Sequence, residues 1–307
     1  MKIALVSTWY PMSISRYFER ALKRRSDIEL ITVGPYTGQF IPWNGGMNLP
    51  AKYAIPPTHP LPSQFIMSGK IHPNLLKNYA DLNDVDLWIE VDAGFYLDPR
   101  PAHGMVAHVA SDPHALTYDR QRQLADKFFC MQTPYMKDED FYLPYAFDPT
   151  IHFPEDHTEK IYDACLVGLA YDHRVRLITV LSAMGLKIRH GIGDIFDEYR
   201  LAYNQSKIAL SWSSLQDLPA RVFEALGMGL PLVANRVPDM PTFFVDGEHY
   251  LGFSDITEAI FQVNRLMRDE DLRHQIADAG HRKVQPHTWD KRITQILSVC
   301  GFNGLGD

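Results

Sequence analysis

The sequence predicts an α/β protein in which two doubly wound domains face a cleft. Strand-like apolar runs alternate with helical patterns through both halves of the chain, and this alternation is typical of βαβ units around a parallel sheet. Residues 142–156 interrupt the alternation with a stretch rich in Pro and acidic residues, which indicates a linker. We therefore expect two Rossmann-like domains, over residues 1–150 and 151–307, with a last helix that can pack back on the first domain.

The N-terminal half opens on a strand, a helix and a second strand. Residues 34–74 then lose periodicity and fill with Pro, Gly and Asn, so this insertion is expected to be either functional or mobile. Later apolar runs predict further buried strands that end in polar residues. The expected elements are strands at 2–7, 28–34, 84–92, 104–111 and 127–132, and a helix at 15–25.

The C-terminal half repeats the alternation. Ligands of doubly wound sheets bind outside the carboxyl ends of the strands, so the cleft between the two halves is the expected site. The expected elements are strands at 162–168, 186–191, 206–212 and 230–234, and helices at 173–185, 197–206, 219–227, 256–269, 270–284 and 288–301.

Composition narrows the class of protein. The 307 residues carry a formal net charge of −7, which gives no support to non-specific nucleic-acid binding. The three cysteines are far apart and form no C-x-x-C pair, so we expect a reducing cytoplasm rather than a disulfide scaffold or a zinc site. No apolar run approaches the length of a membrane span, and the N-terminus does not resemble a signal peptide.

One stretch, residues 15–25, is strongly basic. The favoured interpretation is the solvated face of the first helix, and the alternative is a surface for a phosphate-bearing acceptor. Its basic residues are Arg16, Arg20, Lys23, Arg24 and Arg25.

Several common motifs are missing from the sequence. It contains no P-loop, no G-x-G-x-x-G fingerprint, no G-x-S-x-G elbow and no H-E-x-x-H helix. His103, His108 and His114 are scattered over a predicted strand and its ends. We therefore expect no metal and no cofactor.

Residues 218–235, LPARVFEALGMGLPLVAN, form a short helical pattern between two predicted strands. Arg221 and Glu224 are three residues apart and so lie on one helix face. Pro219 suits the first helical position, and Asp217 is expected to cap the first amides. Gly227 and Gly229 are expected to let the chain turn into the next strand.

The start of this helix predicts an anion site at the cleft. A helix N-terminus favours a diphosphate, and Arg221 can form a fork of hydrogen bonds to phosphate oxygens. Glu224 is acceptor-only when ionised and suits the vicinal diol of a ribose. The alternative is that the two side chains form only a surface pair worth a few tenths of a kcal/mol.

With these residues in view, the segment resembles the nucleotide-sugar site of GT-B glycosyltransferases, especially the CgeB-like, spore-maturation type. Related families carry a first glutamate at the position that is Gln216 here, so a carboxylate contact to the sugar is not carried over. The Arg three residues before the Glu is kept as Arg221. The resemblance covers roughly residues 140–298. Four further segments fit the family in order: 142–154 between the domains, 162–181 as a first strand and helix, 243–255 after the nucleotide site, and 287–297 as the final helix.

The resemblance implies a hexosyltransferase that uses a nucleoside-diphosphate sugar as co-substrate, with a UDP-sugar such as UDP-glucose favoured. Arg221 and Arg174 would offset the charge of the diphosphate leaving group. The alternative for Arg174 is a solvated helix residue. The donor-binding residues expected are Gly168, Arg174, Gly191, Ser213, Arg221, Glu224 and, through its amide, Val222.

An acceptor hydroxyl would need a base from the N-terminal domain. The strand ends offer a cluster of Asp92, Asp112 and His114, although each has a structural alternative as a cap or loop residue. Thr8, Trp9 and Tyr10 follow the first strand and are expected to line the cleft, unless Trp9 belongs to the core.

Three functions stay open at this point. The first is glycosyl transfer to a polysaccharide, a protein, a small molecule or a modified base in phage DNA. The second is a nucleotide-sugar epimerase, and the third is a non-catalytic nucleotide-sugar-binding module.

Overall fold

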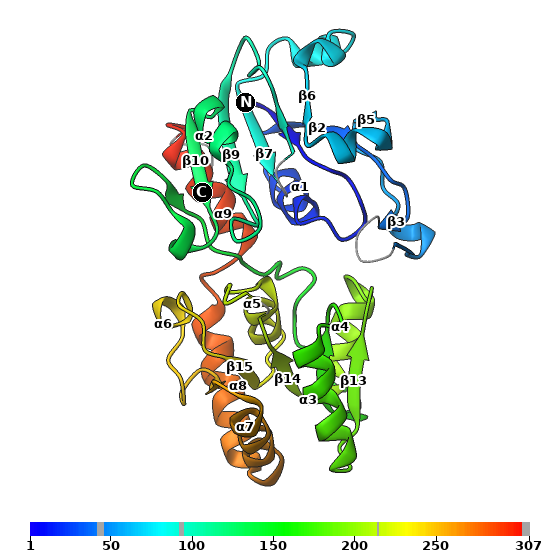
Figure 1. Ribbon diagram of the computed structural model, residues 1–307, viewed down its shortest axis with the longest axis vertical. Helices are drawn as coiled ribbons and strands as arrows, with labels where there is room; N and C mark the ends of the chain where they lie inside the picture. The colour runs from blue at the N-terminus through cyan, green and yellow to red at the C-terminus, as the bar shows by residue number, and fades with distance from the viewer. Residues whose placement is uncertain (42–45, 92–94, 214, 303–307) are drawn as a thin grey trace. The chain divides into compact units, whose positions relative to one another are not determined.

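The computed structural model describes residues 1–41, 46–91, 95–213 and 215–302 (Figure 1). The described chain divides into two compact units. One contains Met1–Pro144 together with the residues from Trp289 onward, and the other contains Tyr145–Thr288. The boundary expected at residue 150 thus lies a little beyond the observed division, and the last helix belongs to the N-terminal unit.

The N-terminal unit is built on a seven-stranded sheet in the order β11-β10-β9-β7-β1-β2-β5, in which every strand pair is parallel. The strand order reverses between β1 and β7, as in a doubly wound sheet. The strands are β1 Lys2–Val6, β2 Glu29–Pro35, β5 His59–Leu61, β7 Leu87–Val91, β9 Met105–Ala110, β10 Lys127–Cys130 and β11 Phe141–Tyr142.

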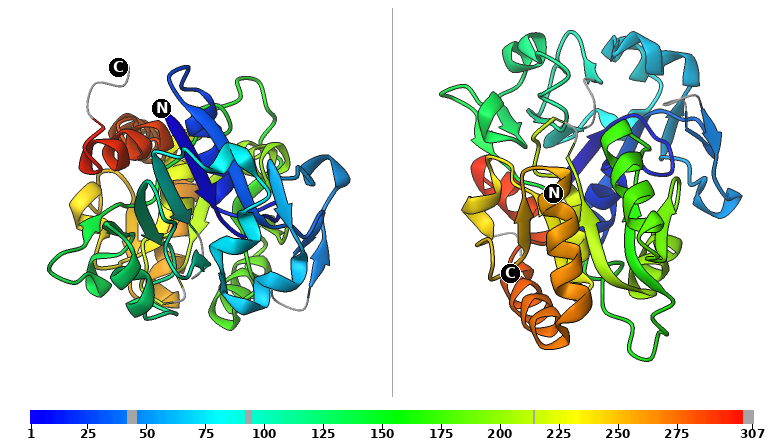
Figure 2. Two further views of the ribbon diagram at one scale, coloured as in Figure 1. Left: turned by 90° about the horizontal axis from the view of Figure 1, so that it is seen from above. Right: turned by 60° about the horizontal axis from the view of Figure 1, so that its bottom comes forward.

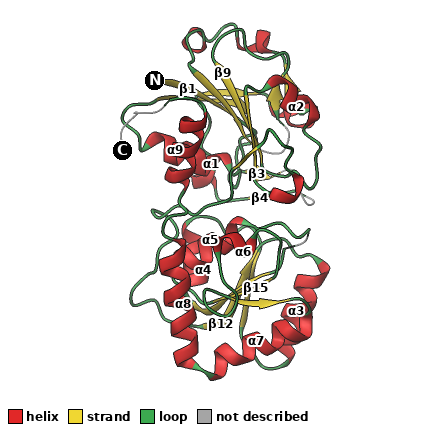
Figure 3. Cartoon of the chain, turned by 90° about the vertical axis from the view of Figure 1, so that its left-hand side faces the viewer, coloured by secondary structure: helices red, strands yellow, loops and turns green. Residues whose placement is uncertain are grey.

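The described residues of this unit form three α-helices: α1 Ser15–Lys23, α2 Asp119–Leu124 and α9 Trp289–Val299. Helices α1 and α9 lie side by side on the sheet (Figure 3). The ring of Trp289 lies 5.1 Å from that of Phe18 and is stacked 5.8 Å from that of Tyr17. This aromatic contact attaches the C-terminal helix to the first helix.

The insertion expected at residues 34–74 contains short regular elements. Its strand β5 extends the main sheet, and the edge strands β3 and β4 pair antiparallel. Strand β6 pairs with β8. The bounds of these strands are β3 Phe40–Ile41, β4 Met47–Asn48, β6 Lys70–Ile71 and β8 Tyr96–Leu97. Short 3-10 helices in and after the insertion span Ala51–Tyr53, Ser63–Ser68, Pro73–Leu76, Ala80–Leu82 and Thr133–Tyr135.

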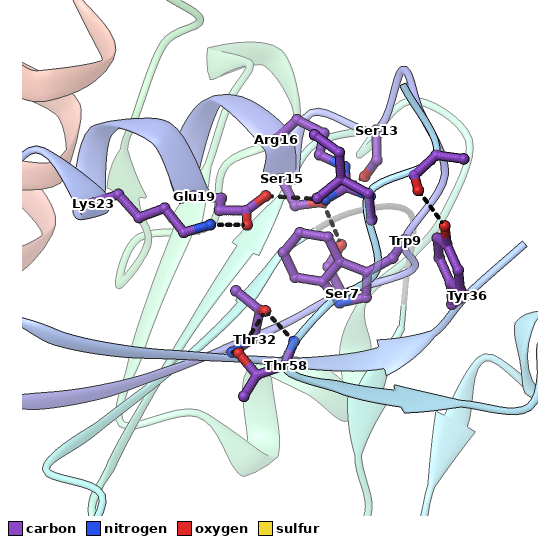
Figure 4. A network of polar contacts seen from close by, with 12 residues as sticks. Ser7, Trp9, Ser13, Ser15, Arg16, Glu19, Lys23, Thr32, Tyr36 and Thr58 are labelled. Carbon is purple, nitrogen blue, oxygen red and sulfur yellow. Dashed lines mark hydrogen bonds and ion pairs between the residues drawn. The ribbon is translucent and has the colours of Figure 1, made fainter. Parts of the chain in front are cut away.

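Side-chain hydrogen bonds fix the insertion to the sheet and to α1 (Figure 4). The Tyr36 hydroxyl donates to the carbonyl of Ala54 at 2.7 Å. The amide of Thr58 donates to Thr32 Oγ1 at 2.7 Å, and the Arg16 guanidinium donates to the carbonyl of Ile55.

Four of the five basic residues in α1 and the turn after it face acidic partners inside the unit. Glu19 pairs with Arg16 at 3.0 Å and with Lys23 at 2.6 Å. Arg24 pairs with Asp290 of α9 at 2.7 Å, and Arg25 pairs with Asp27 at 3.2 Å. Arg20, Lys23 and Arg24 are exposed, as the interpretation as a solvated helix face expects, whereas Arg16 is buried.

The C-terminal unit contains a five-stranded parallel sheet in the order β13-β12-β14-β15-β16. Its strand order reverses between β12 and β14, so the carboxyl ends of these two strands mark the expected ligand edge. The strands are β12 Tyr162–Val167, β13 Ile188–Gly191, β14 Ser206–Ser211, β15 Leu232–Asn235 and β16 Leu251–Phe253.

The described residues of this unit also form six helices: α3 Asp172–Ala183, α4 Asp197–Asn204, α5 Ala220–Gly227, α6 Met240–Phe243, α7 Ile256–Arg268 and α8 Glu270–Val284. Helices α7 and α8, drawn in orange, lie side by side (Figures 1 and 2). The core between strands and helices is mostly aliphatic and includes Leu166, Leu177, Leu210, Val233 and Val263.

The predicted linker is largely part of the C-terminal unit. Phe147, Asp148, Ile151 and His152 are all buried. A Cβ added to Gly227 would lie 2.6 Å from the ring of Phe147, so the segment packs closely against α5. Among the described helices, none combines the length and the apolar character that crossing a bilayer requires.

Candidate functional site

Two arginines and a glycine meet where β12 and β14 end. Arg221 of α5 donates its Nε proton to the carbonyl of Val167 at 2.8 Å. Arg174 of α3 donates to the carbonyls of Trp212 at 2.7 Å and Leu169 at 3.1 Å. The structure therefore brings both predicted phosphate-binding arginines to the carboxyl ends of neighbouring strands.

Gly168 leaves room for these two guanidiniums. A Cβ at this position would lie 2.3 Å from Arg221 Nη2 and 3.3 Å from Arg174 Nη1, and its φ of +147° disfavours any side chain. The glycine thus allows both cations to approach the same stretch of backbone.

Within the described residues, neither Arg174 nor Arg221 forms a salt bridge with a carboxylate; their hydrogen bonds go to backbone carbonyls. Arg174 is only 6% exposed, and burial, followed by the charge of Arg221, lowers its pKa to about 10. In Arg221, Nη1 is enclosed and makes no hydrogen bond within the described part of the chain. A buried donor without a partner beside a second cation is an arrangement that a bound anion would satisfy. The burial of Arg174 excludes its alternative interpretation as a solvated helix residue.

Glu224, one turn further along α5, is buried and held by groups from other elements. The Tyr199 hydroxyl of α4 donates to Glu224 Oε2 at 2.7 Å. His152 Nε2 lies 3.7 Å from Glu224 Oε1. No ion pair within 4.0 Å joins Glu224 to Arg221 in the described residues, so the alternative of a simple surface pair is wrong.

The start of α5 differs in detail from the expectation. Pro219 is the N-cap, the helix begins at Ala220, and no side chain caps it, so the predicted cap by Asp217 is wrong. Asp217 instead accepts a hydrogen bond from Ser213 Oγ. The amide of Val222 already donates to the carbonyl of Pro219 at 3.1 Å, which leaves it no proton for a ligand.

The two remaining donor-site candidates have structural partners. The amide of Ser213 donates to Asn235 Oδ1 at 2.7 Å, which ties the end of β14 to that of β15. The carbonyl of Gly191 accepts from the amide of Gly168 at 2.8 Å. A Cβ at Gly191 would meet Asp194 Oδ2 at 2.0 Å, so Asp194 requires glycine there.

In the N-terminal unit, Asp112 and His114 share the loop after β9, while Asp92 lies outside the described residues. The carbonyl of Asp112 accepts from the amides of Ala115 and Leu116, which forms a turn. His114 Nδ1 lies 3.1 Å from Gln132 Nε2. A pocket of about 380 Å³ is lined by Pro113, His114, Ala115, Leu116, Thr117, Asp119, Arg122, Tyr135 and Lys137.

Of the three residues after β1, Trp9 belongs to the core. It is fully buried, its indole donates to the carbonyl of Val33 at 2.8 Å, and the Arg16 guanidinium lies 4.8 Å from its ring centre (Figure 4). The expectation that Trp9 lines a cleft is therefore wrong. Thr8 is also buried, whereas Tyr10 is partly exposed.

Sequence reasoning missed several buried polar groups. His152 and Tyr199 hold Glu224, and no local pattern singles them out, because each reaches Glu224 from a distant part of the chain. A second buried pair joins β7 and β9, where His108 Nδ1 lies 3.0 Å from Glu90 Oε2. No group of three or more candidate metal-binding side chains occurs in the described residues.

The C-terminal part of the chain is similar in sequence to known proteins. Residues 157–298 match a protein family described as "Glycosyl transferase-like". The chain is 28% identical over 105 residues to the sulfoquinovosyl transferase SQD2 of Arabidopsis thaliana. That match covers 33% of this chain and 21% of the plant protein, so the chain spans about a fifth of that relative's length.

Solved structures resemble the whole chain. A sucrose-phosphate synthase from Thermosynechococcus elongatus has a TM-score of 0.64 at 13% identity, with 98% of each chain covered. HepE of Anabaena, in complex with UDP and glucose, has a TM-score of 0.62 at 12% identity and covers 97% of this chain and 100% of its own. MnaA of S. aureus, in a co-structure with UDP, has a TM-score of 0.58 at 14% identity over 98% of this chain and 97% of its own. Residues 157–298 are thus similar to glycosyl transferase-like domains, and the chain has the α/β fold of GT-B glycosyltransferases.

Proposed function

We propose that this chain is a glycosyltransferase that moves a sugar from a UDP-sugar to an acceptor hydroxyl. The observation that carries the proposal is the pair Arg174 and Arg221 beside Gly168, where a buried guanidinium nitrogen makes no hydrogen bond within the described chain. Glu224 follows one turn later on the helix that carries Arg221. A diphosphate on the arginines and a ribose on the carboxylate would use all three side chains.

The arginines would act mainly as the glycosidic bond breaks. Negative charge then accumulates on the leaving diphosphate, and preplaced cations in a partly buried site stabilise that charge. The amides of Ala220 and Arg221, which precede the paired amide of Val222 at the start of α5, would add to the effect. The donor is a co-substrate, and the proposal includes no further cofactor.

The choice of a uridine nucleotide draws on related structures. HepE was solved with UDP-glucose as well as with UDP, and MnaA with UDP. Uridine diphosphate is therefore the first ligand to test on this chain. The narrower CgeB-like assignment stays a prediction.

The acceptor side of the proposal rests on the loop after β9. Asp112 and His114 remain the proposed source of the base, because they share a loop at the carboxyl end of that strand. The two cations that line the pocket beside His114 already have acidic partners, Lys137 with Asp119 and Arg122 with Asp140, which favours an uncharged acceptor. A modified DNA base is the less favoured acceptor, because Arg16, Lys23, Arg24 and Arg25 already face acidic partners.

Binding of UDP to arginine variants tests the donor site. Arg221→Ala and Arg174→Ala should each weaken binding by roughly tenfold to a hundredfold, since a charge-assisted hydrogen bond contributes about 1.5–3 kcal/mol. Arg176→Ala removes an exposed arginine of the same helix as Arg174 and should bind UDP like the wild type. Normal UDP binding by both site variants would show that the site is wrongly assigned.

Product analysis separates the three candidate functions. Release of UDP that depends on an added acceptor supports transfer. Conversion of a UDP-sugar without any acceptor supports an epimerase, and tight binding without turnover over a broad acceptor panel supports a binding module.

A further inference from the structure

Two side chains from outside its helix lie against the carboxylate of Glu224: the Tyr199 hydroxyl donates a hydrogen bond to Oε2 at 2.7 Å, and His152 Nε2 lies 3.7 Å from Oε1. Tyr199 belongs to α4, and His152 belongs to the segment that precedes β12. We propose that Tyr199 and His152 are positioning residues that aim Glu224 at the ribose hydroxyls of the donor, and so make the site select ribonucleotides over deoxyribonucleotides. This inference rests on the proposed function.

His152 is fixed in one tautomer. The backbone amide of Asp148 donates to His152 Nδ1 at 3.1 Å. A ring nitrogen that accepts a hydrogen bond carries no proton, so the proton of the neutral ring is on Nε2. Nε2 is the atom that lies 3.7 Å from Glu224 Oε1, so His152 directs an N–H edge at the carboxylate.

A compact turn keeps His152 in this orientation. The Asp148 carboxylate accepts from the amide of Thr150 at 3.0 Å and from its hydroxyl at 2.7 Å. The carbonyl of Asp148 accepts from the amides of Ile151 at 3.0 Å and His152 at 2.7 Å. Because His152 is 1% exposed, its ring has little space in which to turn away from Glu224.

Tyr199 supplies the second contact. Its hydroxyl lies 2.7 Å from Glu224 Oε2, a distance typical of a charge-assisted hydrogen bond. Burial, and then the charge of Glu224, raises the pKa of Tyr199 well above its usual value, so the phenol stays protonated and donates. The ring itself packs edge-on against His152, with ring centres 5.7 Å apart, and in a tilted arrangement against Tyr203, with ring centres 4.7 Å apart.

The two contacts leave acceptor capacity on Glu224 for a ligand. A carboxylate offers about four lone-pair sites, and the hydrogen bond from Tyr199 occupies one of them. This bond fixes Oε2, while His152 Nε2 lies near Oε1 at 3.7 Å, beyond hydrogen-bond distance, and contributes by its charge distribution and its bulk. A nucleotide without ribose hydroxyls would leave this buried charge under-satisfied, and unpaired buried polar groups are a strong source of discrimination.

The test compares UDP with 2′,3′-dideoxy-UDP by calorimetry. Wild type should prefer UDP by roughly tenfold or more, as expected for a hydrogen bond to a charged group. Tyr199→Phe and His152→Asn should each reduce this preference about threefold or more while binding of the dideoxy nucleotide stays the same. The asparagine can still accept from the amide of Asp148 but no longer reaches Glu224.

Two further variants separate positioning from a general effect on the fold. His152→Gln, whose amide reaches further, should restore much of the preference. Tyr250→Phe removes the hydroxyl of a buried tyrosine that makes no hydrogen bond or ion pair with Glu224, and should keep the wild-type ratio.

The outcomes distinguish this inference from the proposed function. If Tyr199→Phe and His152→Asn keep the full wild-type preference and change only the melting temperature, the positioning role is wrong while the donor site stands. If the wild type itself shows no preference for UDP, the assignment of Glu224 to the ribose fails, and this inference fails with it.

Discussion

At the scale of single residues, Gly168 determines whether two cations can share one site. Its backbone conformation and the 2.3 Å approach of Arg221 Nη2 both exclude a side chain. The sequence supplied the glycine and both arginines as candidates. It could not supply their contacts, because Arg174 and Arg221 approach the end of β12 from different helices.

Gly168→Ala should weaken UDP binding roughly tenfold or more, because the new Cβ displaces the Arg221 guanidinium and one charge-assisted contact is lost. Gly185→Ala is the matched control. Gly185 also has a positive φ, of +90°, but nothing lies within 4 Å of its added Cβ. The control should lose stability, by about 1 kcal/mol, and keep its affinity for UDP. Equal affinities of Gly168→Ala and Gly185→Ala for UDP would contradict the claim that Gly168 makes room for both guanidiniums.

The lowered pKa of Arg174 predicts a pH dependence of binding. Burial, reinforced by the charge of Arg221, places this pKa at about 10 in the free protein. A bound diphosphate favours the charged guanidinium, so affinity should be constant from about pH 7 to 9 and fall as the pH rises through 10, by at most about tenfold per pH unit. Titration of the uridine contributes equally to wild type and to Arg174→Gln, so the difference between their profiles isolates Arg174. Parallel profiles would contradict this assignment.

At the scale of elements, the alternation of strands and helices could be predicted because each element carries its own apolar pattern. Strand β12 and helices α7 and α8 appear close to their expected positions. The two-residue strands of the insertion could not be predicted, since pairing with distant chain defines them. The same applies to residues 145–156, whose Pro-rich composition indicates a linker although their side chains pack against α5 and Glu224.

Gly227 shows this packing most directly. Gly227→Ala should destabilise the protein by about 1–3 kcal/mol, because the added Cβ would lie 2.6 Å from the ring of Phe147 in a packed interior. Combining it with Phe147→Leu should cost less than the sum of the two single changes, as expected for residues in contact. Thermal unfolding of the four proteins measures the coupling, and strict additivity would argue against this contact.

At the scale of the whole molecule, the chain completes its N-terminal unit with its last helix. Arg292 Nε donates to the carbonyl of Pro144 at 2.8 Å, and Gln295 donates to the carbonyl of Tyr142 at 2.7 Å. The sequence predicted that the last helix can pack on the N-terminal unit. It could not decide between the two units, because the apolar pattern of α9 is compatible with packing against either one.

Trp289→Ala tests this organisation. The substitution removes a fully buried ring between Tyr17 and Phe18 and should destabilise the N-terminal unit by about 3–5 kcal/mol. The proposed donor site lies in the other unit, so we expect UDP binding at low temperature to persist. Loss of UDP binding in a variant that remains folded would show that the two units depend on each other more than the contacts within each unit indicate.

The most direct measurement for the central claim is a crystal structure of the protein with UDP. The account predicts diphosphate oxygens within about 3 Å of the guanidiniums of Arg174 and Arg221, and ribose hydroxyls at the carboxylate of Glu224. A nucleotide bound away from Gly168, with both guanidiniums still in their present contacts, would contradict it.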